Sequence, residues 1–227
     1  MKTCYMCEQP AISREHVPPK CIFPEQKDSP GKVDYKKNLI TVPACAEHNL
    51  KTSMGDEYLL AIIAFHWRNN EVAENQSSTK IARALRGSKH YYDLFFGPNR
   101  HQFLYWQGDI LVTSDVDINR LNSELDKIAR GIFYHHFRQK WTNAVSIRHF
   151  SLAAIYKQSH PVIDALNRIS ELMRQACILE RKHGSNPAVF FYQVAGDTPP
   201  TSTFIRMVFY GGFEIVAVLD AGSGVIP

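Results

Sequence analysis

The sequence lacks the long apolar segments that membrane proteins and secretory precursors carry. Among its 227 residues, no apolar run reaches the ~18–20 residues that a bilayer crossing needs. The start, Met1 to Cys4, also lacks the apolar stretch of a secretory signal. Internal repeats and low-complexity tracts are missing too. We therefore expect a globular cytoplasmic protein that has no membrane partner.

A strong excess of one charge is missing as well. The formal net charge is only +4, and up to Phe65 the basic and acidic residues balance at eight each. A charge of this size permits nucleic-acid binding without requiring it. Because the whole excess lies after Phe65, we expect any surface that binds a phosphate backbone to lie largely beyond the N-terminal segment.

Cysteines are few, but four of the five gather near the N-terminus. These are Cys4, Cys7, Cys21 and Cys45, whereas Cys177 stands alone far downstream. In a reducing compartment, clustered cysteines more often bind metal than form disulfides. The grouping therefore directs attention to a metal site in the first 50 residues.

Two pairs have the spacing of zinc knuckles, Cys4-x-x-Cys7 and Cys45-x-x-His48. Together they make a Cys3His set, the closed tetrahedral coordination of structural zinc. The segment is rich in turn formers, and zinc ligation can supply folding free energy on the order of 10 kcal/mol to such a chain. Cys21 could substitute as a ligand but has no paired neighbour. The alternative is a set of reduced thiols without metal.

Between the knuckles lies Arg14-Glu15-His16-Val17-Pro18-Pro19, then Asn38-Leu39, and Asn49 directly follows His48. A Glu-His after a CxxC pair, a later Asn-Leu, and a second knuckle followed at once by Asn resemble the HNH endonucleases with a ββα-metal core. The resemblance covers the chain up to about Gly55 and extends to uncharacterised bacterial and phage members of that family.

The resemblance implies roles for four residues. His16 would be the general base that activates water, and Asn38 would brace the loop that orients it. Glu15 and Asn49 would hold a catalytic divalent ion, Mg²⁺ or Mn²⁺, separate from the structural zinc. The sequence departs from the commonest pattern at three positions. Glu15 stands for Asp or His, Asn49 for the final His, and His48 for a knuckle Cys.

These residue types suit phosphodiester hydrolysis on chemical grounds. An imidazole such as that of His16 can take a proton from water near neutral pH. A divalent cation neutralises the charge that develops on the phosphate, and oxygen ligands suit Mg²⁺ or Mn²⁺. In the plainer interpretation, His16 is an ordinary surface histidine and Asn49 only caps a helix. For Asp56-Glu57 we favour a solvated first helical turn over metal binding.

The rest of the chain predicts an α+β fold. A zinc-bound ββα-metal module, treble-clef-like, occupies residues 1–67, and an accessory region for substrate binding, oligomerisation or regulation occupies residues 68–227. This region comprises a helical middle and a C-terminal antiparallel β-meander. We expect helices over 56–67 and 78–87, from Asp117, and from Ser159 to Gly184, and strands within 103–113, 189–194, 204–210 and 213–219.

Basic residues are densest in the stretch Lys80, Arg83, Arg86 and Lys89. They could contact phosphates, although such charges often form only a solvated helix face. The consecutive residues His135 and His136 lie late in the helix that starts at Asp117, where adjacent side chains point to different faces. We therefore interpret this pair as surface residues and not as a second metal site.

The sequence thus predicts a metal-dependent HNH endonuclease that hydrolyses DNA, with RNA as an open alternative substrate. A role in phage defence follows only by association with the family. Two other functions stay open. One is a zinc-stabilised module that binds nucleic acid or protein without cutting. The other is a nuclease subunit that is silent until a defence-system partner activates it, and a homodimer is equally open.

Overall fold

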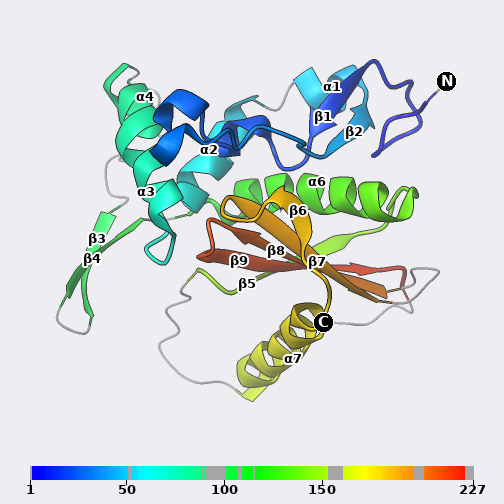
Figure 1. Ribbon diagram of the computed structural model, residues 1–227. Helices are drawn as coiled ribbons and strands as arrows, with labels where there is room; N and C mark the ends of the chain where they lie inside the picture. Colours follow the sequence, from blue (N-terminus) through cyan, green and yellow to red (C-terminus); the bar gives the residue numbers. More distant parts are fainter. Residues whose placement is uncertain are drawn as a thin grey trace.

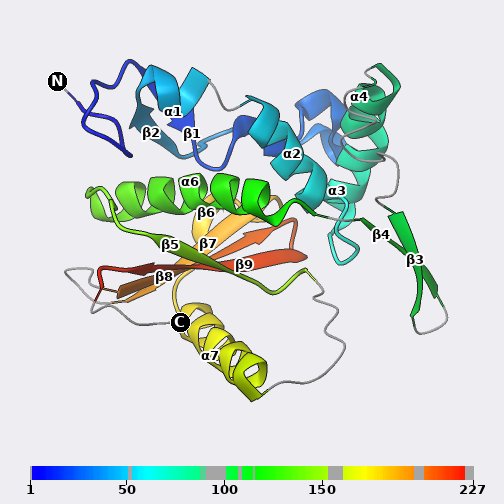
Figure 2. The ribbon, with the colours of Figure 1, turned by 180° about the vertical axis from the view of Figure 1, so that it is seen from behind.

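The computed structural model describes residues 2–50, 53–87, 89, 101–106, 109–114, 116–152, 161–196 and 202–222. Figure 1 shows the N-terminal segment on one side of helix α6, and a five-stranded sheet on the other side of the same helix. Helix α7 covers the far face of that sheet, and Figure 2 shows the same order of layers from behind. The chain is therefore mixed helix and sheet, as expected.

The C-terminal sheet is antiparallel throughout, in the order β5-β9-β8-β7-β6. Its strands are β5 (Val145–His149), β6 (His183–Asn186), β7 (Phe190–Gly196), β8 (Ser202–Phe209) and β9 (Phe213–Asp220). The predicted meander of three strands is confirmed. A tight turn with positive φ at Tyr210 and Gly211 joins β8 to β9. The short edge strands β5 and β6 were not anticipated from the sequence.

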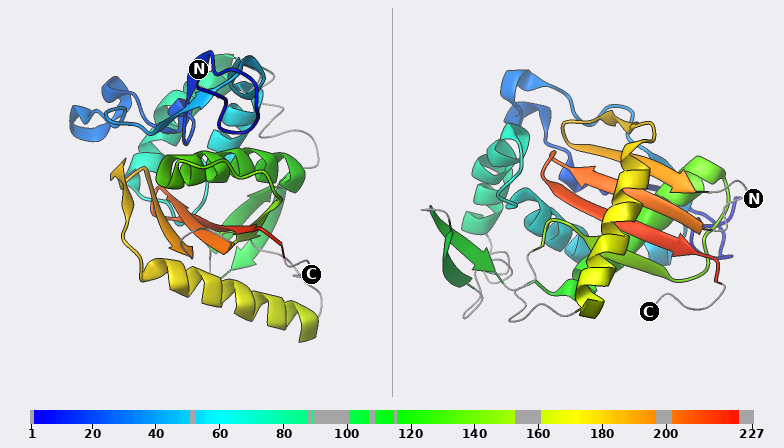
Figure 3. Two further views of the ribbon diagram at one scale, coloured as in Figure 1. Left: turned by 90° about the vertical axis from the view of Figure 1, so that its right-hand side faces the viewer. Right: turned by 90° about the horizontal axis from the view of Figure 1, so that it is seen from below.

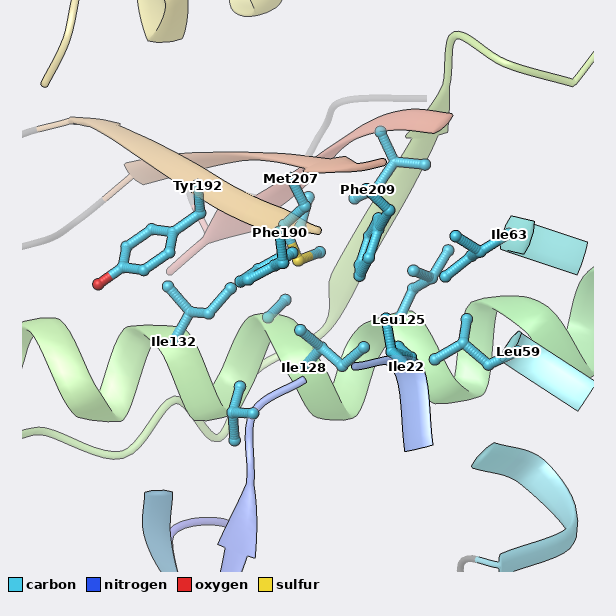
Figure 4. Packing of buried hydrophobic residues seen from close by; sticks show 14 of the residues in the cluster. Ile22, Leu59, Ile63, Leu125, Ile128, Ile132, Phe190, Tyr192, Met207 and Phe209 are labelled. Carbon is cyan, nitrogen blue, oxygen red and sulfur yellow. The ribbon is translucent and has the colours of Figure 1, made fainter. Parts of the chain in front are cut away.

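Helix α6 spans Ile118–Phe137 and packs against one face of the sheet. The Asp117 carboxylate accepts a hydrogen bond from the Arg120 backbone N–H, as an N-cap residue does. Of the apolar residues that recur every three or four positions along this helix, four are buried: Leu121, Leu125, Ile128 and Ile132. Figure 4 shows the last three among the core residues between this helix and strands of the sheet.

Helix α7 spans Pro161–Ile178 and lies across the opposite face of the sheet (Figure 3). In the sequence, the apolar stripe of this helix runs from Ile163 through Leu166, Ile169, Leu172 or Met173, and Ala176 to Leu179, and this prediction is wrong in part. Leu172 and Leu179 are 70% and 87% exposed, while Met173 and Cys177 are buried. The predicted end was wrong as well, because Gly184 belongs to strand β6.

The helical middle begins earlier than the sequence suggested. Its elements are α2 (Ser53–Ala64), α3 (Glu71–Gln76), a π-helical turn (Ser77–Ile81) and α4 (Ala82–Gly87). The last three follow without a break, and Asn70 caps them by accepting from the backbone N–H groups of Val72 and Ala73. Ser78, the expected start of the 78–87 helix, is therefore not an N-cap; its hydroxyl donates to the Asn75 carbonyl.

The predicted strand pair in the middle is confirmed as β3 (His101–Trp106) and β4 (Asp109–Ser114). Figure 1 shows this antiparallel hairpin standing apart from the main sheet. No helix within the described ranges is long and apolar enough to cross a membrane.

One hydrophobic cluster joins the N-terminal segment to the C-terminal sheet. It includes Ile22 and Leu59 from the first 67 residues and Leu125, Phe190 and Phe209 from the remainder. Burial of each such side chain stabilises the fold by about 1.5–3 kcal/mol. The two regions therefore share a core, and the functional division at residue 67 stays a prediction.

Candidate metal centre and adjoining pocket

The N-terminal segment contains a small hairpin followed at once by a helix. Strand β1 (Ser13–His16) pairs antiparallel with β2 (Thr41–Ala44), and α1 (Ala46–Leu50) comes one residue later. The knuckle loop is fastened to the hairpin because the Tyr5 backbone N–H donates to the Pro43 carbonyl over 2.8 Å. These contacts bring the two predicted knuckles to the same place.

The four predicted zinc ligands lie together in the structure. The sulfurs of Cys7 and Cys45 are 3.8 Å apart. The Nδ1 atom of His48 lies 3.5 Å from the Cys4 sulfur, 3.6 Å from that of Cys7 and 3.2 Å from that of Cys45. All four ligand atoms fall within 4.8 Å of one another.

These spacings match the edges of a tetrahedron around zinc. Zn–S and Zn–N bonds of about 2.3 and 2.05 Å place two sulfurs about 3.8 Å apart, and a sulfur and a nitrogen about 3.5 Å apart. The Cys3His set could therefore bind a metal such as zinc. Cys21 is not part of it, since its thiol donates to the Asp56 carbonyl.

Local hydrogen bonds favour the metal-binding form of Cys45. Burial by itself raises the pKa of this thiol, but hydrogen bonds from the His48 backbone and ring outweigh it and lower the pKa to about 6. A thiolate is the form that ligates metal. The start of helix α1 thus supplies both a ligand and the donors that ionise it.

A small cavity of about 20 Å³ adjoins the metal cluster. That space is large enough for one water molecule or ion. The cavity lies between the end of β1, the start of α2 and one side of α6, and its polar lining residues are Glu15, His16, His48, Asp56, Glu124 and Lys127. Two residues of the predicted catalytic set, Glu15 and His16, therefore share one pocket.

The environment of Glu15 disfavours its negative charge. Burial raises the pKa of this carboxyl to about 7, and the nearby negative charges of Asp56 and Glu124 act in the same direction. A positive ion between facing carboxylates would relieve this repulsion. Asp56, interpreted from the sequence as a solvated residue, is instead half-buried and lines the pocket.

The surroundings of His16 favour the neutral form of its imidazole. Burial lowers the pKa of this imidazole, and the positive charges of Lys20 and Arg14 lower it further. A neutral imidazole can accept a proton, which is the property a general base needs.

The two predicted asparagines lie elsewhere around the hairpin. The Asn49 amide on α1 donates to the Ser13 hydroxyl on β1 over 2.6 Å, so it joins the helix to the strand that carries Glu15 and His16. Asn38 has a positive φ of 54° and lies in the loop before β2. Neither asparagine lines the small pocket among its described residues.

Among the described residues, the Cys3His set is the only group of three or more His, Cys, Asp and Glu side chains close enough to share an ion. Glu15 and Asn49 as ligands of a catalytic ion stay a prediction. No local pattern in the sequence indicates Glu124 and Lys127, because they reach the pocket from α6, more than a hundred residues beyond His16.

Two of the predicted phosphate-contacting residues have partners within the protein. The Lys80 ammonium donates to the Cys21 carbonyl over 2.8 Å, and Arg83 forms a two-pronged ion pair with Asp28. These contacts fasten α4 and the preceding turn to the N-terminal loop. Arg86 and Lys89 are exposed. Phosphate binding by the four residues stays a prediction.

No protein-family model, curated protein or solved structure matches this chain.

Proposed function

We propose that the protein is a metal-dependent endonuclease of the HNH type that hydrolyses phosphodiester bonds of DNA. The observation that carries the proposal is the joint position of Glu15 and His16. Both line a water-sized pocket beside a Cys3His cluster, at the end of a hairpin followed at once by a helix. This order of elements is what a zinc-stabilised ββα-metal module requires.

In this proposal the Cys3His cluster is structural. It ties the loop of Cys4 and Cys7 to the start of α1, and all four ligand positions are filled by protein side chains, which is typical of a closed structural zinc site. Its contribution to catalysis is to hold β1 and α1 in fixed positions relative to each other. Asn49, bonded to Ser13, adds a second link between the same elements.

His16 acts as the general base. Its neutral imidazole takes a proton from the attacking water, at the edge of the pocket that the water would enter. Such a group commonly contributes a factor of about 10²–10⁴ to the rate. Burial, with the nearby positive charges of Lys20 and Arg14, lowers the pKa of this imidazole and so favours its neutral form.

Glu15 and Asp56 are the carboxylates best placed for a catalytic Mg²⁺ or Mn²⁺, since both line the pocket and the charge of Asp56 is close enough to raise the pKa of Glu15. When bound, such an ion supplies positive charge to the scissile phosphate. We assign Asn49, the second ligand expected from the family resemblance, a supporting role in the hairpin, because its amide donates to the Ser13 hydroxyl.

The proposal is tested with supercoiled plasmid and single-stranded DNA, in Mg²⁺ or Mn²⁺ and in their absence. We expect cutting only with the added ion, and a loss of about 100-fold or more in Glu15→Gln and Asp56→Asn. Glu57→Gln is the matched control, because Glu57 neighbours Asp56 but is not among the residues that line the pocket. Equal cutting by all three variants would refute the assignment.

The same assay separates the alternatives. DNA binding without cutting, by wild-type protein that carries zinc, would indicate a binding module. Cutting that appears only after addition of a cell extract fraction would indicate a subunit that a partner activates.

A further inference from the structure

A second and larger cavity, of about 410 Å³, adjoins the N-terminal hairpin. Its walls come from the loop and strands of that hairpin, the C-terminal end of α6, and strands β6 and β7. The residues that line it are Arg14, Asn38, Leu39, Ile40, Thr41, His135, Arg138, His183, Gly184, Ser185 and Tyr192. The volume falls within the range of about 300–1,000 Å³ typical of small-molecule sites.

Basic groups dominate the charged lining of this cavity. Arg14 and Arg138 contribute guanidinium groups, and His135 and His183 contribute imidazoles. No aspartate or glutamate is among the described residues of the lining. The Arg14 guanidinium donates through Nε and one Nη to the Thr41 hydroxyl, which fixes its orientation at the cavity wall. A guanidinium has five donors, so this contact leaves others for a ligand.

The basic groups are close enough to disfavour one another. Burial lowers the pKa of His135, and the charges of Arg138 and His183 lower it further. Burial also lowers the pKa of His183. An anion shared by these groups would relieve the repulsion. Burial also raises the pKa of Tyr192 to about 12, so its hydroxyl stays a hydrogen-bond donor.

Hydrogen bonds hold two walls of the cavity together, strand β6 and the hairpin loop. The Ser185 hydroxyl donates to the Asn38 carbonyl over 3.2 Å, and the Asn186 amide donates to the Lys37 carbonyl over 3.1 Å. These two bonds hold β6 against the hairpin loop. In Figure 4 the ring of Tyr192 lies beside Ile132 of α6, with its hydroxyl directed away from Phe190 and the core. A preformed site of this kind loses little free energy to ordering when a ligand binds.

The cavity neighbours the proposed catalytic base. Thr41 pairs directly with His16 across the hairpin, and Arg14 precedes His16 by two residues on β1. Directly opposed residues, and residues two apart on one strand, share a face of the hairpin. A ligand in the cavity would therefore lie on the face of the hairpin to which His16 belongs.

We propose that this cavity binds the phosphate group of a nucleotide, which Arg14 and Arg138 contact with His135 and His183 completing the cradle. Guanidinium groups match phosphate oxygens through paired N–H donors. The phosphate comes from a free nucleotide or from a nucleic-acid strand. The strand as source rests on the proposed nuclease function, whereas phosphate binding itself does not.

The test measures binding without cleavage. Zinc-loaded full-length protein is titrated by calorimetry, without added Mg²⁺ or Mn²⁺, with inorganic phosphate, AMP, and a short single-stranded DNA bearing either a 5′-phosphate or a 5′-hydroxyl. Histidine side-chain NMR signals of His135 and His183 are followed in parallel. Arg138→Gln is the test variant, and Arg168→Gln is the matched control, since Arg168 is exposed on α7 across the sheet.

We expect at least one phosphate-bearing probe to bind, to shift the His135 and His183 signals, and to bind about tenfold or more weakly to Arg138→Gln. Arg168→Gln should match wild type. If AMP binds, the source of the phosphate group is a free nucleotide. If only the DNA binds, and inorganic phosphate competes with it, the source is a nucleic-acid strand.

Two results would overturn the inference: no binding of any probe to wild type, or equal binding by wild type and Arg138→Gln. In the first case Arg138 and His135 serve only to offset the negative end of the α6 dipole, and Arg138→Gln lowers the melting temperature alone. Because no step measures cleavage, failure here leaves the proposed nuclease function intact, and an inactive nuclease could still bind phosphate.

Discussion

Replacement of Gly131 by alanine tests how tightly α6 supports the strand that carries His16. Gly131 lies on α6 against Val17, the residue that follows His16. A Cβ atom at Gly131 would lie 2.6 Å from Cγ2 and 3.0 Å from Cγ1 of Val17. A 2.6 Å approach falls below the 3.0 Å that Cβ contacts essentially never cross, so either the helix or Val17 must move.

Two opposing contributions decide the sign of the effect. Alanine is favoured over glycine within a helix by about 1 kcal/mol. Overpacking of a filled core costs about 1–3 kcal/mol. Because Val17 is only 3% exposed and belongs to the core cluster, it has little room to turn away. We therefore expect Gly131→Ala to lower the free energy of unfolding by about 1 kcal/mol.

Urea unfolding of zinc-loaded protein measures this value. Gly87→Ala is the matched control, since a Cβ at Gly87, the last residue of α4, meets nothing within 4 Å and should leave stability unchanged or higher. In the double variant with Val17→Ala the clash disappears, so the two changes should be non-additive by about 1 kcal/mol or more. The reasoning is refuted if Gly131→Ala is as stable as Gly87→Ala and additive with Val17→Ala.

Three further outcomes are expected. Cys45→Ser should bind zinc about 100- to 1,000-fold more weakly, if the four ligands share equally a binding free energy of about 10–16 kcal/mol. Elemental analysis should then find little zinc in the variant, and full zinc retention would contradict the site. Burial lowers the pKa of His149 to about 4, below its unfolded value, so its contribution to stability is complete above pH 6.5 and lost as the pH falls toward 4. Between pH 6.5 and 4, urea unfolding should show that wild type loses about 2–3 kcal/mol of unfolding free energy that His149→Gln does not lose. An equal dependence on pH in the two proteins would contradict this role of His149. Glu214 accepts hydrogen bonds from Arg206 over 2.6 Å and Arg174 over 2.5 Å, so Glu214→Gln should lower the free energy of unfolding by about 3–5 kcal/mol; a loss below about 1 kcal/mol would show that the network is unimportant.

Local signals in the sequence predicted the elements that depend on local rules. The Cys3His set could be inferred because each knuckle brings two ligands together within one turn, and the structure joins the two pairs. Helix α6 combines an N-cap at Asp117 with a regular apolar stripe, so both its start and its buried face were predictable.

The phase of α7 was not predictable, because its helix carries apolar residues on more than one side. The stripe in the sequence passes through Leu172 or Met173 and ends at Leu179, whereas the sheet contacts Met173 and Cys177. Only the position of the sheet decides between these faces. The 78–87 helix was placed too late for a similar reason: Asn70 provides the stronger cap, and the chain continues through a π-helical turn.

The pockets depend on contacts between distant segments. Asp56 looked like a solvated residue of a first helical turn until α2 placed it beside Glu15. The cavity that contains Arg14 and Arg138 joins positions more than a hundred residues apart, and no spacing rule connects them. Lys80, interpreted as a phosphate contact, donates to a backbone carbonyl because the N-terminal loop folds over it.

The most direct test of the central claim is cleavage of supercoiled plasmid by wild type and His16→Ala, purified identically and matched for zinc content and melting temperature. With Mg²⁺ or Mn²⁺ present, we predict cutting by wild type and a rate at least about 100-fold lower for the variant. Equal rates in the two proteins would contradict the assignment of His16 as the general base. Absence of cutting by both, with zinc bound, would contradict the claim that this chain is a nuclease by itself.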